Sequence, residues 1–206
     1  MISDCRLDDQ PRTQIPDALE AIERDTAAIG FTLASEPRTG SLLRTLAASK
    51  PGGRFLELGT GTGVGTAWLL AGMDAGSHLD SVDSNATVSA IAQRHLANDP
   101  RVTFHISDAA AFLARLQPGA FDFVYADAWT GKFTHLDLAL SLLRIGGIYF
   151  VDDLLPQSNW PDDHPPKVGS LVAGLESRPG FMAAKLAWAS GLMLLVRADR
   201  EKQSAI

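Results

Sequence analysis

The sequence contains a single cysteine, Cys5, in 206 residues. One thiol cannot form a disulfide within the chain, which excludes a fold held together by internal disulfides. Cys5 stands in a polar N-terminal segment in which we expect no partner to activate it, so we interpret it as a bystander.

Positive charge and long apolar runs are also scarce. The chain has 18 Lys and Arg against 24 Asp and Glu, a formal net charge of −6. This balance argues against nucleic acid and anionic membranes as partners, because binding to both depends on clustered basic residues. No apolar run reaches the roughly 18 residues of a membrane span, and the polar, acidic N-terminus argues against a signal peptide. We therefore expect a cytoplasmic protein that acts on small molecules.

The hydrophobic content, in contrast, is 46%, with 20% charged residues, which is enough to bury one sizeable core. We predict a single domain over 1–206. It would consist of a mobile arm over 1–16, two amphipathic helices within 17–50 and an α/β core over 54–198.

Within this core, β-like runs alternate with helical periodicity, which predicts βαβ units and a parallel sheet. A final pair of strands, separated only by Ser190 and Gly191, would form an antiparallel hairpin at the sheet edge. The predicted strands are 54–58, 78–83, 101–106, 121–127, 146–152, 181–189 and 192–199, and the predicted helices after the first strand are 65–73, 86–97, 109–116, 135–145 and 167–178.

A glycine-rich loop, Glu57-Leu-Gly-Thr-Gly-Thr-Gly63, follows the first predicted strand. In an open α/β sheet, ligands bind at the carboxyl ends of the strands, and this first turn is the usual place. The loop does not match the dinucleotide pattern G-x-G-x-x-G. If the pattern starts at Gly59, its third glycine is replaced by Val64, and if it starts at Gly61, its third glycine is replaced by Thr66. The preceding carboxylate would repel a pyrophosphate and suits a ligand that carries an ammonium group.

This arrangement resembles motif I of the class I S-adenosylmethionine-dependent methyltransferases, and the resemblance extends from about Glu36 to the end of the chain. It implies a Rossmann-like, mostly parallel seven-stranded sheet with helices on both faces and an antiparallel C-terminal edge hairpin. It also implies S-adenosylmethionine (SAM) as cofactor. A glycine turn that serves strand–helix packing alone is the alternative. The loop residues that would bind the cofactor are Glu57, Gly59, Thr60, Gly61 and Gly63.

The ends of the next two predicted strands carry further residues that would bind the cofactor. Asp83, with Ser84, ends a strand about 20 residues after the loop, where an acid accepts hydrogen bonds from both ribose hydroxyls; a solvated strand-end Asp is the alternative. Asp108 and Ala109 match the adenine-binding position of the family. Asp108 suits the N-cap of the following helix equally well.

The next two predicted strands end at Asp127-Ala-Trp129 and at Asp152-Asp153. These two strand ends resemble those of the catechol-type O-methyltransferase branch, which uses Mg²⁺. The resemblance implies metal binding by Asp127, Asp152 and Asp153, with Asp127 and Asp152 also catalytic. It implies that Asp127 and Trp129 contact the cofactor as well. The fifth strand departs from the family's usual Asp-Asn, because it ends in two aspartates.

The lysine that directly follows the tryptophan in the catechol enzymes is Thr130 here. Lys132, two residues later, is the candidate catalytic replacement. The proline-rich segment that follows the Asp pair carries Asn159, Trp160 and His164, which would shape a pocket with an aromatic wall for a planar methyl acceptor. Alternatively, the prolines stiffen an ordinary surface crossing.

Three functions remain open at this point. The first is methyl transfer from SAM to a hydroxyl of a small molecule. In relatives, two copies often pair through the N-terminal helices, so we also expect a homodimer here. The second is a non-catalytic SAM-binding protein. The third is a nicotinamide-dependent dehydrogenase, which the sequence disfavours because the third fingerprint glycine and a Tyr-x-x-x-Lys set are missing.

Overall fold

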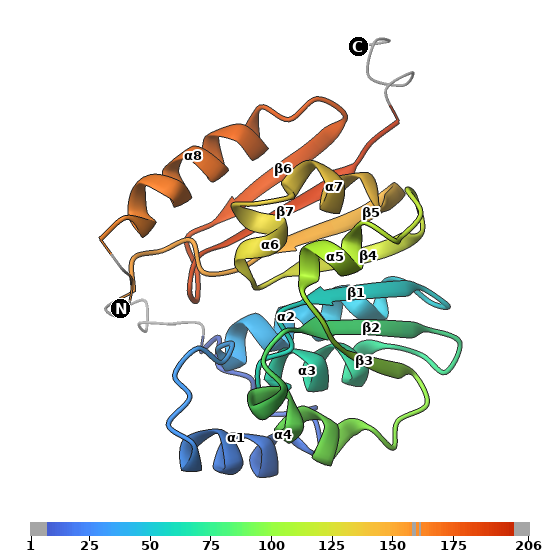
Figure 1. Cartoon of the computed structure of the whole chain (residues 1–206), viewed down its shortest axis with the longest axis vertical. Helices are drawn as coiled ribbons and strands as arrows, with labels where there is room; N and C mark the ends of the chain where they lie inside the picture. The colour runs from blue at the N-terminus through green and yellow to red at the C-terminus, as the bar shows by residue number, and fades with distance from the viewer. Residues whose placement is uncertain (1–7, 158–159, 161, 200–206) are drawn as a thin grey trace, which may run out of the picture.

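A seven-stranded sheet organises the chain in the computed structural model, which describes residues 8–157, 160 and 162–199. The strand order is β3-β2-β1-β4-β5-β7-β6, and β7 pairs antiparallel with both β5 and β6 (Figure 1). The predicted Rossmann-like sheet with an antiparallel edge hairpin is therefore confirmed. The strands are β1 (Arg54–Leu58), β2 (His78–Asp83), β3 (Val102–Ile106), β4 (Phe121–Ala126), β5 (Leu143–Val151), β6 (Phe181–Leu186) and β7 (Leu192–Arg197).

Helices cover both faces of this sheet, and α8 runs alongside the β6 end (Figure 1). Alternate residues of the central strands point to opposite faces: Phe55 packs in one hydrophobic cluster with α1 to α4, and Leu56 packs in the other with α5, α7 and α8. The helices are α1 (Leu19–Ala28), α2 (Pro37–Ala48), α3 (Val64–Gly72), α4 (Ala86–Leu96), α5 (Ala109–Leu113), α6 (Trp129–Lys132), α7 (Leu136–Ser141) and α8 (His164–Glu176).

The apolar faces of α1 and α2 pack inside the chain itself. Leu19 and Ile22 of α1 and Leu43 of α2 are buried in the first cluster. The amphipathic pattern that suggested pairing between two copies is therefore used for packing within one copy, and a homodimer stays a prediction. Residues 8–16 make side-chain contacts as well, since Trp188 Nε1 donates to Asp9 at 2.5 Å.

Several element boundaries differ from the sequence-based prediction. The β6–β7 connection spans residues 187–191 and not Ser190 and Gly191 alone. Helix α7 ends at Ser141 and β5 already begins at Leu143, because Leu143 pairs with Phe121 before a register shift in the β4–β5 ladder. The short helix α6 was not predicted. No helix in the described part of the chain is long and apolar enough to cross a membrane.

Candidate active site

The glycine loop joins β1 to α3 at the carboxyl edge of the sheet. Gly59, Gly61 and Gly63 all have positive φ, of 101°, 52° and 94°. A Cβ at Gly59 would lie 2.8 Å from the Asp127 carbonyl oxygen, and one at Gly63 would lie 2.7 Å from the Ala92 Cβ. These two glycines therefore allow close packing. A Cβ at Gly61 would meet only Phe31, at 3.6 Å, so this part of the loop is left open to a ligand.

Glu57 lies beneath the loop and is fully buried. Its Oε2 accepts hydrogen bonds of 2.5 Å from the hydroxyls of Thr66 and Ser81, which ties β1 to α3 and β2. Its Oε1 has no hydrogen-bond partner among the described residues. Burial raises the pKa of Glu57 to about 8.

Asp83, at the end of β2, holds the loop from the other side. One carboxylate oxygen accepts from the Gly61 N–H at 2.8 Å, and the other accepts from the Asn85 N–H at 2.8 Å. Each oxygen has a second lone pair for a ligand hydroxyl. Ser84, which was predicted to bind the cofactor, is exposed and does not line the cavity beside the glycine loop, whereas Asn85 does.

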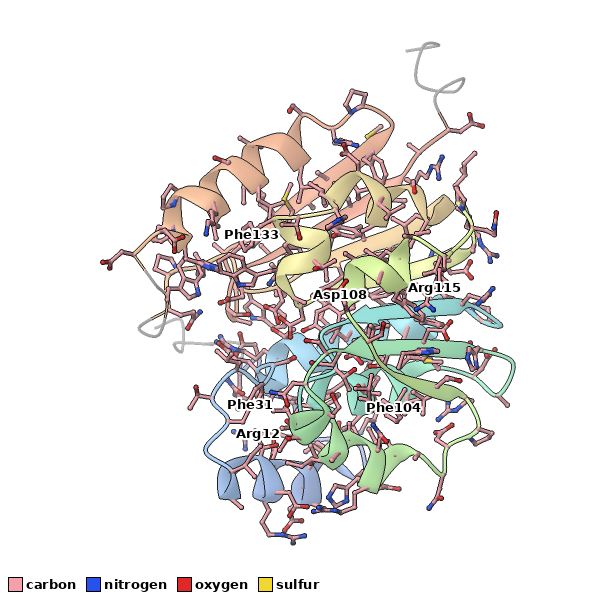
Figure 2. The ribbon with its side chains drawn as sticks, in the orientation of Figure 1. Arg12, Phe31, Phe104, Asp108, Arg115 and Phe133 are labelled. Atoms are coloured by element: carbon pink, nitrogen blue, oxygen red, sulfur yellow. The ribbon has the colours of Figure 1, made fainter. Side chains whose placement is uncertain are left out.

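These groups line a cavity of about 230 Å³, which we call the glycine-loop cavity. Its opposite wall is the link between α1 and α2, including Phe31, which Figure 2 labels. The lining residues are Phe31, Leu33, Ala34, Ser35, Gly59, Thr60, Gly61, Thr62, Val64, Gly65, Asp83, Asn85, Val88, Asp127 and Ala128.

Asp108 caps α5, as one of its two interpretations predicted. Its side chain, labelled in Figure 2, accepts a hydrogen bond from the Ala111 N–H, and the two atoms are 2.8 Å apart. Asp108 is exposed, and neither it nor Ala109 is among the residues that line the glycine-loop cavity. Adenine binding by this pair stays a prediction.

A second cavity, of about 390 Å³, adjoins the first; we call it the aspartate cavity. The two cavities share five of their lining residues: Leu33, Ala34, Ser35, Asp127 and Ala128. The rest of its lining is Thr32, Glu36, Trp129, Lys132, Asp152, Asp153, Gln157, Trp160, His164 and Ser190. Trp129, which was predicted to flank adenine, thus lies in this second wall.

Asp152 is the most buried acid of the aspartate cavity, with 2% of its surface exposed. It accepts hydrogen bonds from the Ser190 hydroxyl, from the Tyr125 hydroxyl at 3.1 Å and from the Asp153 N–H at 2.7 Å. Burial raises the pKa of Asp152 above its ordinary value. Burial and the nearby charge of Asp152 raise the pKa of Asp127 to about 7.

Lys132 brings a positive charge to these acids. Its Nζ lies 3.9 Å from Asp127 Oδ1 and donates a 3.2 Å hydrogen bond to the Asp152 carbonyl oxygen. The side chain is 5% exposed. The predicted catalytic residues Asp127, Lys132 and Asp152 therefore lie together.

Asp153 lines the same cavity and contacts an aromatic cluster. It has a φ of 63°, and both of its carboxylate oxygens accept from Trp160 Nε1 at 3.1 Å. The Trp160 and His164 ring centroids are 4.3 Å apart, and His164 also contacts Trp129 and Phe133 (Phe133 is labelled in Figure 2). Asn159 lies outside the described residues.

His164 Nε2 is buried and has no hydrogen-bond partner among the residues that the structure describes. Burial lowers the pKa of His164 below its ordinary value. This buried nitrogen therefore lies within the wall of the aspartate cavity, which His164 lines.

The predicted metal ligands do not fit a Mg²⁺ site. Mg²⁺ requires near-octahedral oxygen ligands at about 2.1 Å, but Asp152 is engaged by three protein donors and Asp153 by Trp160. The third acid, Asp127, already faces an ammonium group. Within residues 8–157, 160 and 162–199, no group of three or more His, Cys, Asp or Glu could hold a metal ion.

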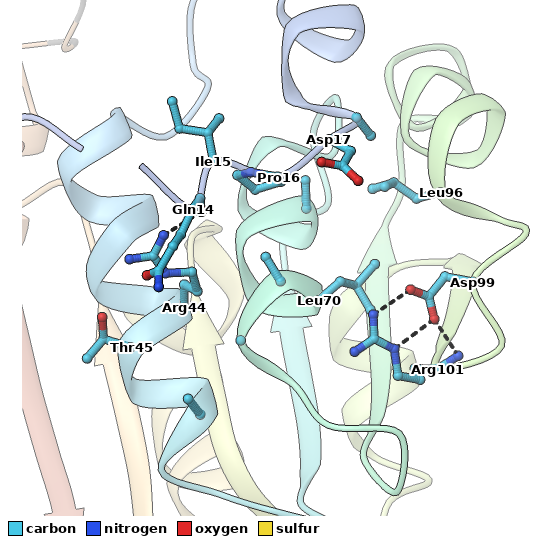
Figure 3. A pocket seen from close by; sticks show the side chains of 15 residues that line it. Gln14, Ile15, Pro16, Asp17, Arg44, Thr45, Leu70, Leu96, Asp99 and Arg101 are labelled. Atoms are coloured by element: carbon cyan, nitrogen blue, oxygen red, sulfur yellow. Dashed lines mark hydrogen bonds and ion pairs between the residues drawn. The ribbon is translucent and has the colours of Figure 1, made fainter. Parts of the chain in front are cut away.

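A larger hollow, of about 740 Å³, lies among α2, α3, α4 and residues 14–18 (Figure 3). Its two arginines are already bound within the chain: Arg101 pairs with Asp99, and Arg44 donates to the Thr13 and Gln14 carbonyl oxygens. None of the predicted site residues lines it. The two adjoining cavities are therefore the better candidate site.

The site contains residues that sequence reasoning missed, above all residues 31–35 and Ser190. Residues 31–35 lie between two helices without a recognisable motif, and Ser190 was assigned only to a turn. One signal was present: the segment 31–33 contains Phe31 and Leu33 outside a helix, which favours contact with another part of the chain or a ligand.

Comparison with known proteins agrees with this geometry. A family model described as a methyltransferase domain matches residues 56–154, which include the glycine loop, Asp83 and all three acids. The predicted resemblance to methyltransferases is confirmed.

Relatives in the curated set carry related names. One from Mycolicibacterium vanbaalenii, named "Putative O-methyltransferase", is 33% identical over 140 residues, which are 66% of this chain and 62% of that protein. A similarly named relative from Mycolicibacterium smegmatis is 34% identical over 116 residues, which are 54% of this chain and 55% of that protein. The matches thus span about 55–62% of the length of these relatives.

Solved structures share the fold over most of the chain. The O-methyltransferase TomG from Streptomyces achromogenes, involved in tomaymycin synthesis and solved with SAM, has a TM-score of 0.77 at 24% identity, covering 89% of this chain and 90% of that one. An O-methyltransferase from Bacillus cereus solved with SAH has a TM-score of 0.75 at 22% identity, covering 87% and 90%. At such identities the likeness establishes the Rossmann-like fold.

Proposed function

We propose that this chain is a SAM-dependent methyltransferase that transfers a methyl group to a hydroxyl of a small, planar molecule. The observation that carries the proposal is the pair of adjoining cavities with a common wall at Asp127 and Ala128. A methyl donor in one cavity and an acceptor in the other would meet at that wall. The methyltransferase-domain match over residues 56–154 supports the same assignment.

The glycine-loop cavity would hold the donor. Asp83 offers its free lone pairs to the ribose hydroxyls, and the open side of Gly61 admits the methionine portion close to the backbone. Glu57 stabilises the loop from below through Thr66 and Ser81. When bound, SAM supplies an electrophilic methyl group on a sulfonium that is already reactive, so the protein contributes mainly position and orientation.

The aspartate cavity would hold the acceptor. Trp160 and Trp129 offer aromatic surface to a planar molecule, and Lys132 faces its hydroxyl. Asp127 and Lys132 would hold the acceptor oxygen towards the methyl group of the donor, whose carbon–sulfur bond would break with its electron pair left on sulfur. The hydroxyl proton would pass to Asp127, which lines both cavities. Lys132 would stabilise the negative charge that develops on the oxygen.

Mg²⁺, which the resemblance to the catechol-type branch implies, has no part in these steps. The carboxylates that would bind it are engaged by Ser190, Tyr125, Trp160 and Lys132.

The decisive experiment has two stages. Calorimetric titration with SAM and with NAD⁺ separates a methyltransferase from a dehydrogenase, and we expect binding of SAM alone. A screen of hydroxylated aromatics, measured as S-adenosylhomocysteine release, then separates an enzyme from a non-catalytic SAM-binding protein. Failure of SAM to bind would refute the proposal; binding without turnover of any hydroxylated aromatic would refute its catalytic part. Light scattering of the same sample would test the predicted homodimer.

A further inference from the structure

Lys132 occupies the position in which a cation would neutralise the acids of the aspartate cavity. Its Nζ lies 3.9 Å from Asp127 Oδ1 and bonds to the Asp152 carbonyl oxygen at 3.2 Å, and its side chain is almost fully buried. Carboxylates that line one cavity repel one another unless a positive charge lies between or beside them. In this chain a side chain supplies that charge.

The backbone around Lys132 is shaped to direct it inwards. Thr130 and Gly131 interrupt α6 with non-helical dihedrals, and Gly131 has a φ of 95°. A Cβ at Gly131 would lie 2.6 Å from Leu58 Cδ1, so only glycine fits. The Gly131 carbonyl oxygen accepts from the buried Tyr149 hydroxyl, and its N–H donates to the Thr134 carbonyl oxygen at 2.7 Å. The turn is therefore fixed by the core of the sheet.

The same acids are unsuited to a divalent cation. Three donors, from Ser190, Tyr125 and Asp153, point at the oxygens of Asp152. A metal could turn the Ser190 and Tyr125 hydroxyls aside, but it would still have to approach the ammonium of Lys132, which repels it. The donor set thus favours a built-in cation over a bound one.

We infer that Lys132 replaces the divalent metal of the catechol-type branch and makes methyl transfer by this chain independent of added metal. This inference rests on the proposed function, because it assigns Lys132 to the acceptor hydroxyl of that reaction. The ammonium donates a hydrogen bond to the acceptor oxygen and stabilises its developing charge, as a bound metal would.

Metal binding tests the inference without any turnover. Mn²⁺ titration followed by electron paramagnetic resonance is expected to show no saturable site in the parent protein. Lys132→Ala removes the cation and leaves space beside Asp127 and Asp152, so it is expected to gain a Mn²⁺ site that Lys132→Ala/Asp127→Asn lacks. Lys185→Ala, which removes an exposed lysine paired with Glu176, is the matched control and is expected to gain no site.

Activity provides the second measurement once an acceptor is known. EDTA is expected to leave the parent rate within about twofold, and Lys132→Met is expected to reduce turnover by about 100-fold, the effect of losing one donor at a developing oxyanion. A saturable Mn²⁺ site in the parent protein that Asp127→Asn removes would overturn the inference, as would loss of activity in EDTA that Mg²⁺ restores. A folded Lys132→Ala variant that gains no Mn²⁺ site would overturn it as well. Because the Mn²⁺ titration requires neither SAM nor an acceptor, failure of the proposed function would be recognised separately, in the SAM titration.

Discussion

The glycine-loop cavity and the aspartate cavity share a wall but are built from different parts of the chain. The first is shaped by backbone, since its positive-φ glycines and the N–H groups bound by Asp83 come from residues close in sequence. The second is shaped by side chains from the α1–α2 link, the segments that follow β4 and β5, α6, α8 and the β6–β7 connection. Its residues include buried charges and Asp153 at positive φ. We infer that the donor side is rigid and generic, and that specificity for the acceptor resides in the second cavity.

The strongest test of this difference is Asp152→Ala. The substitution leaves the Ser190 and Tyr125 hydroxyls and the Asp153 N–H without their acceptor. Each orphaned donor costs about 1–3 kcal/mol, so we expect the free energy of unfolding to fall by about 3 kcal/mol in urea denaturation. SAM should still bind to the variant below its unfolding transition, because Asp152 lines only the aspartate cavity.

The matched control for this measurement is Asp137→Ala. Asp137 is an exposed acid on α7 that pairs with Arg178, and its loss should change stability by less than about 0.5 kcal/mol. Asp152→Asn, which retains one acceptor oxygen, should fall between the two. Loss of SAM binding in folded Asp152→Asn would contradict the separation of the two cavities.

A smaller effect is expected on the donor side from Asp83→Ala. A hydrogen bond to a charged group contributes about 1.5–3 kcal/mol, so the dissociation constant of SAM should rise by roughly 10- to 150-fold. Calorimetry measures this directly. Asp108→Ala is the informative partner, because Asp108 caps α5 outside the glycine-loop cavity.

For Asp108→Ala we expect unchanged SAM affinity and a loss of about 1 kcal/mol in stability, the usual cost of a lost N-cap. Weaker SAM binding in this variant would show that Asp108 contacts adenine. Equal SAM affinity in Asp83→Ala and the parent protein would remove Asp83 from the donor site.

The contrast also explains what could be predicted from the sequence. The boundaries of β1 and β2 follow from short-range periodicity, and the turn after β1 follows from glycines whose spacing is visible in one loop. The cap role of Asp108 was one of two predictions, and local backbone geometry decided it. Features fixed by neighbours in sequence are accessible to sequence analysis.

The aspartate cavity was less predictable, because its contacts join distant residues. Ser190 reaches Asp152 only because β7 pairs with β5, and Ser35 reaches Tyr125 only because the α1–α2 link crosses the sheet edge. The direction of Lys132 depends on the positive φ of Gly131, which the pattern Trp-Thr-Gly-Lys does not specify. The predicted metal ligands likewise come from distant strand ends, and their hydrogen bonds to Ser190 and Trp160 are not specified by the sequence pattern.

Glu57→Gln tests the buried acid below the glycine loop. Glu57 has a pKa of about 8 in the folded chain, above its ordinary value of 4.5, so the native state holds a proton that the unfolded chain releases between these values. Its contribution to stability is therefore complete below about pH 4.5 and is lost as the pH rises through about 8. Parent stability should fall by roughly 1.4 kcal/mol per pH unit in this window from Glu57.

Glutamine has no proton to release, so the stability of Glu57→Gln relative to the parent should increase steadily from pH 5 to pH 8. Urea denaturation of the ligand-free protein at several pH values measures this difference. Glu176→Gln, at an exposed glutamate paired with Lys185, is the control and should leave the pH dependence unchanged. A constant difference between Glu57→Gln and the parent across the window would mean that Glu57 is ionised in the folded chain.

The smallest expected effect concerns the aromatic wall of the aspartate cavity. Trp160 lines this cavity and donates its indole N–H to Asp153. Its ring centroid lies 4.3 Å from that of His164. Aromatic contact contributes about 0.5–1.5 kcal/mol beyond area burial, so Trp160→Ala should raise KM for a planar acceptor by roughly fivefold with little change in SAM affinity. Trp160→Phe retains the ring and loses only the N–H, and it should keep most of the acceptor affinity. Steady-state kinetics of the two variants separate these contributions. Equal KM values for the parent and Trp160→Ala would exclude Trp160 from acceptor binding. A parallel rise in the SAM dissociation constant of Trp160→Ala would mean that the two cavities are not independent.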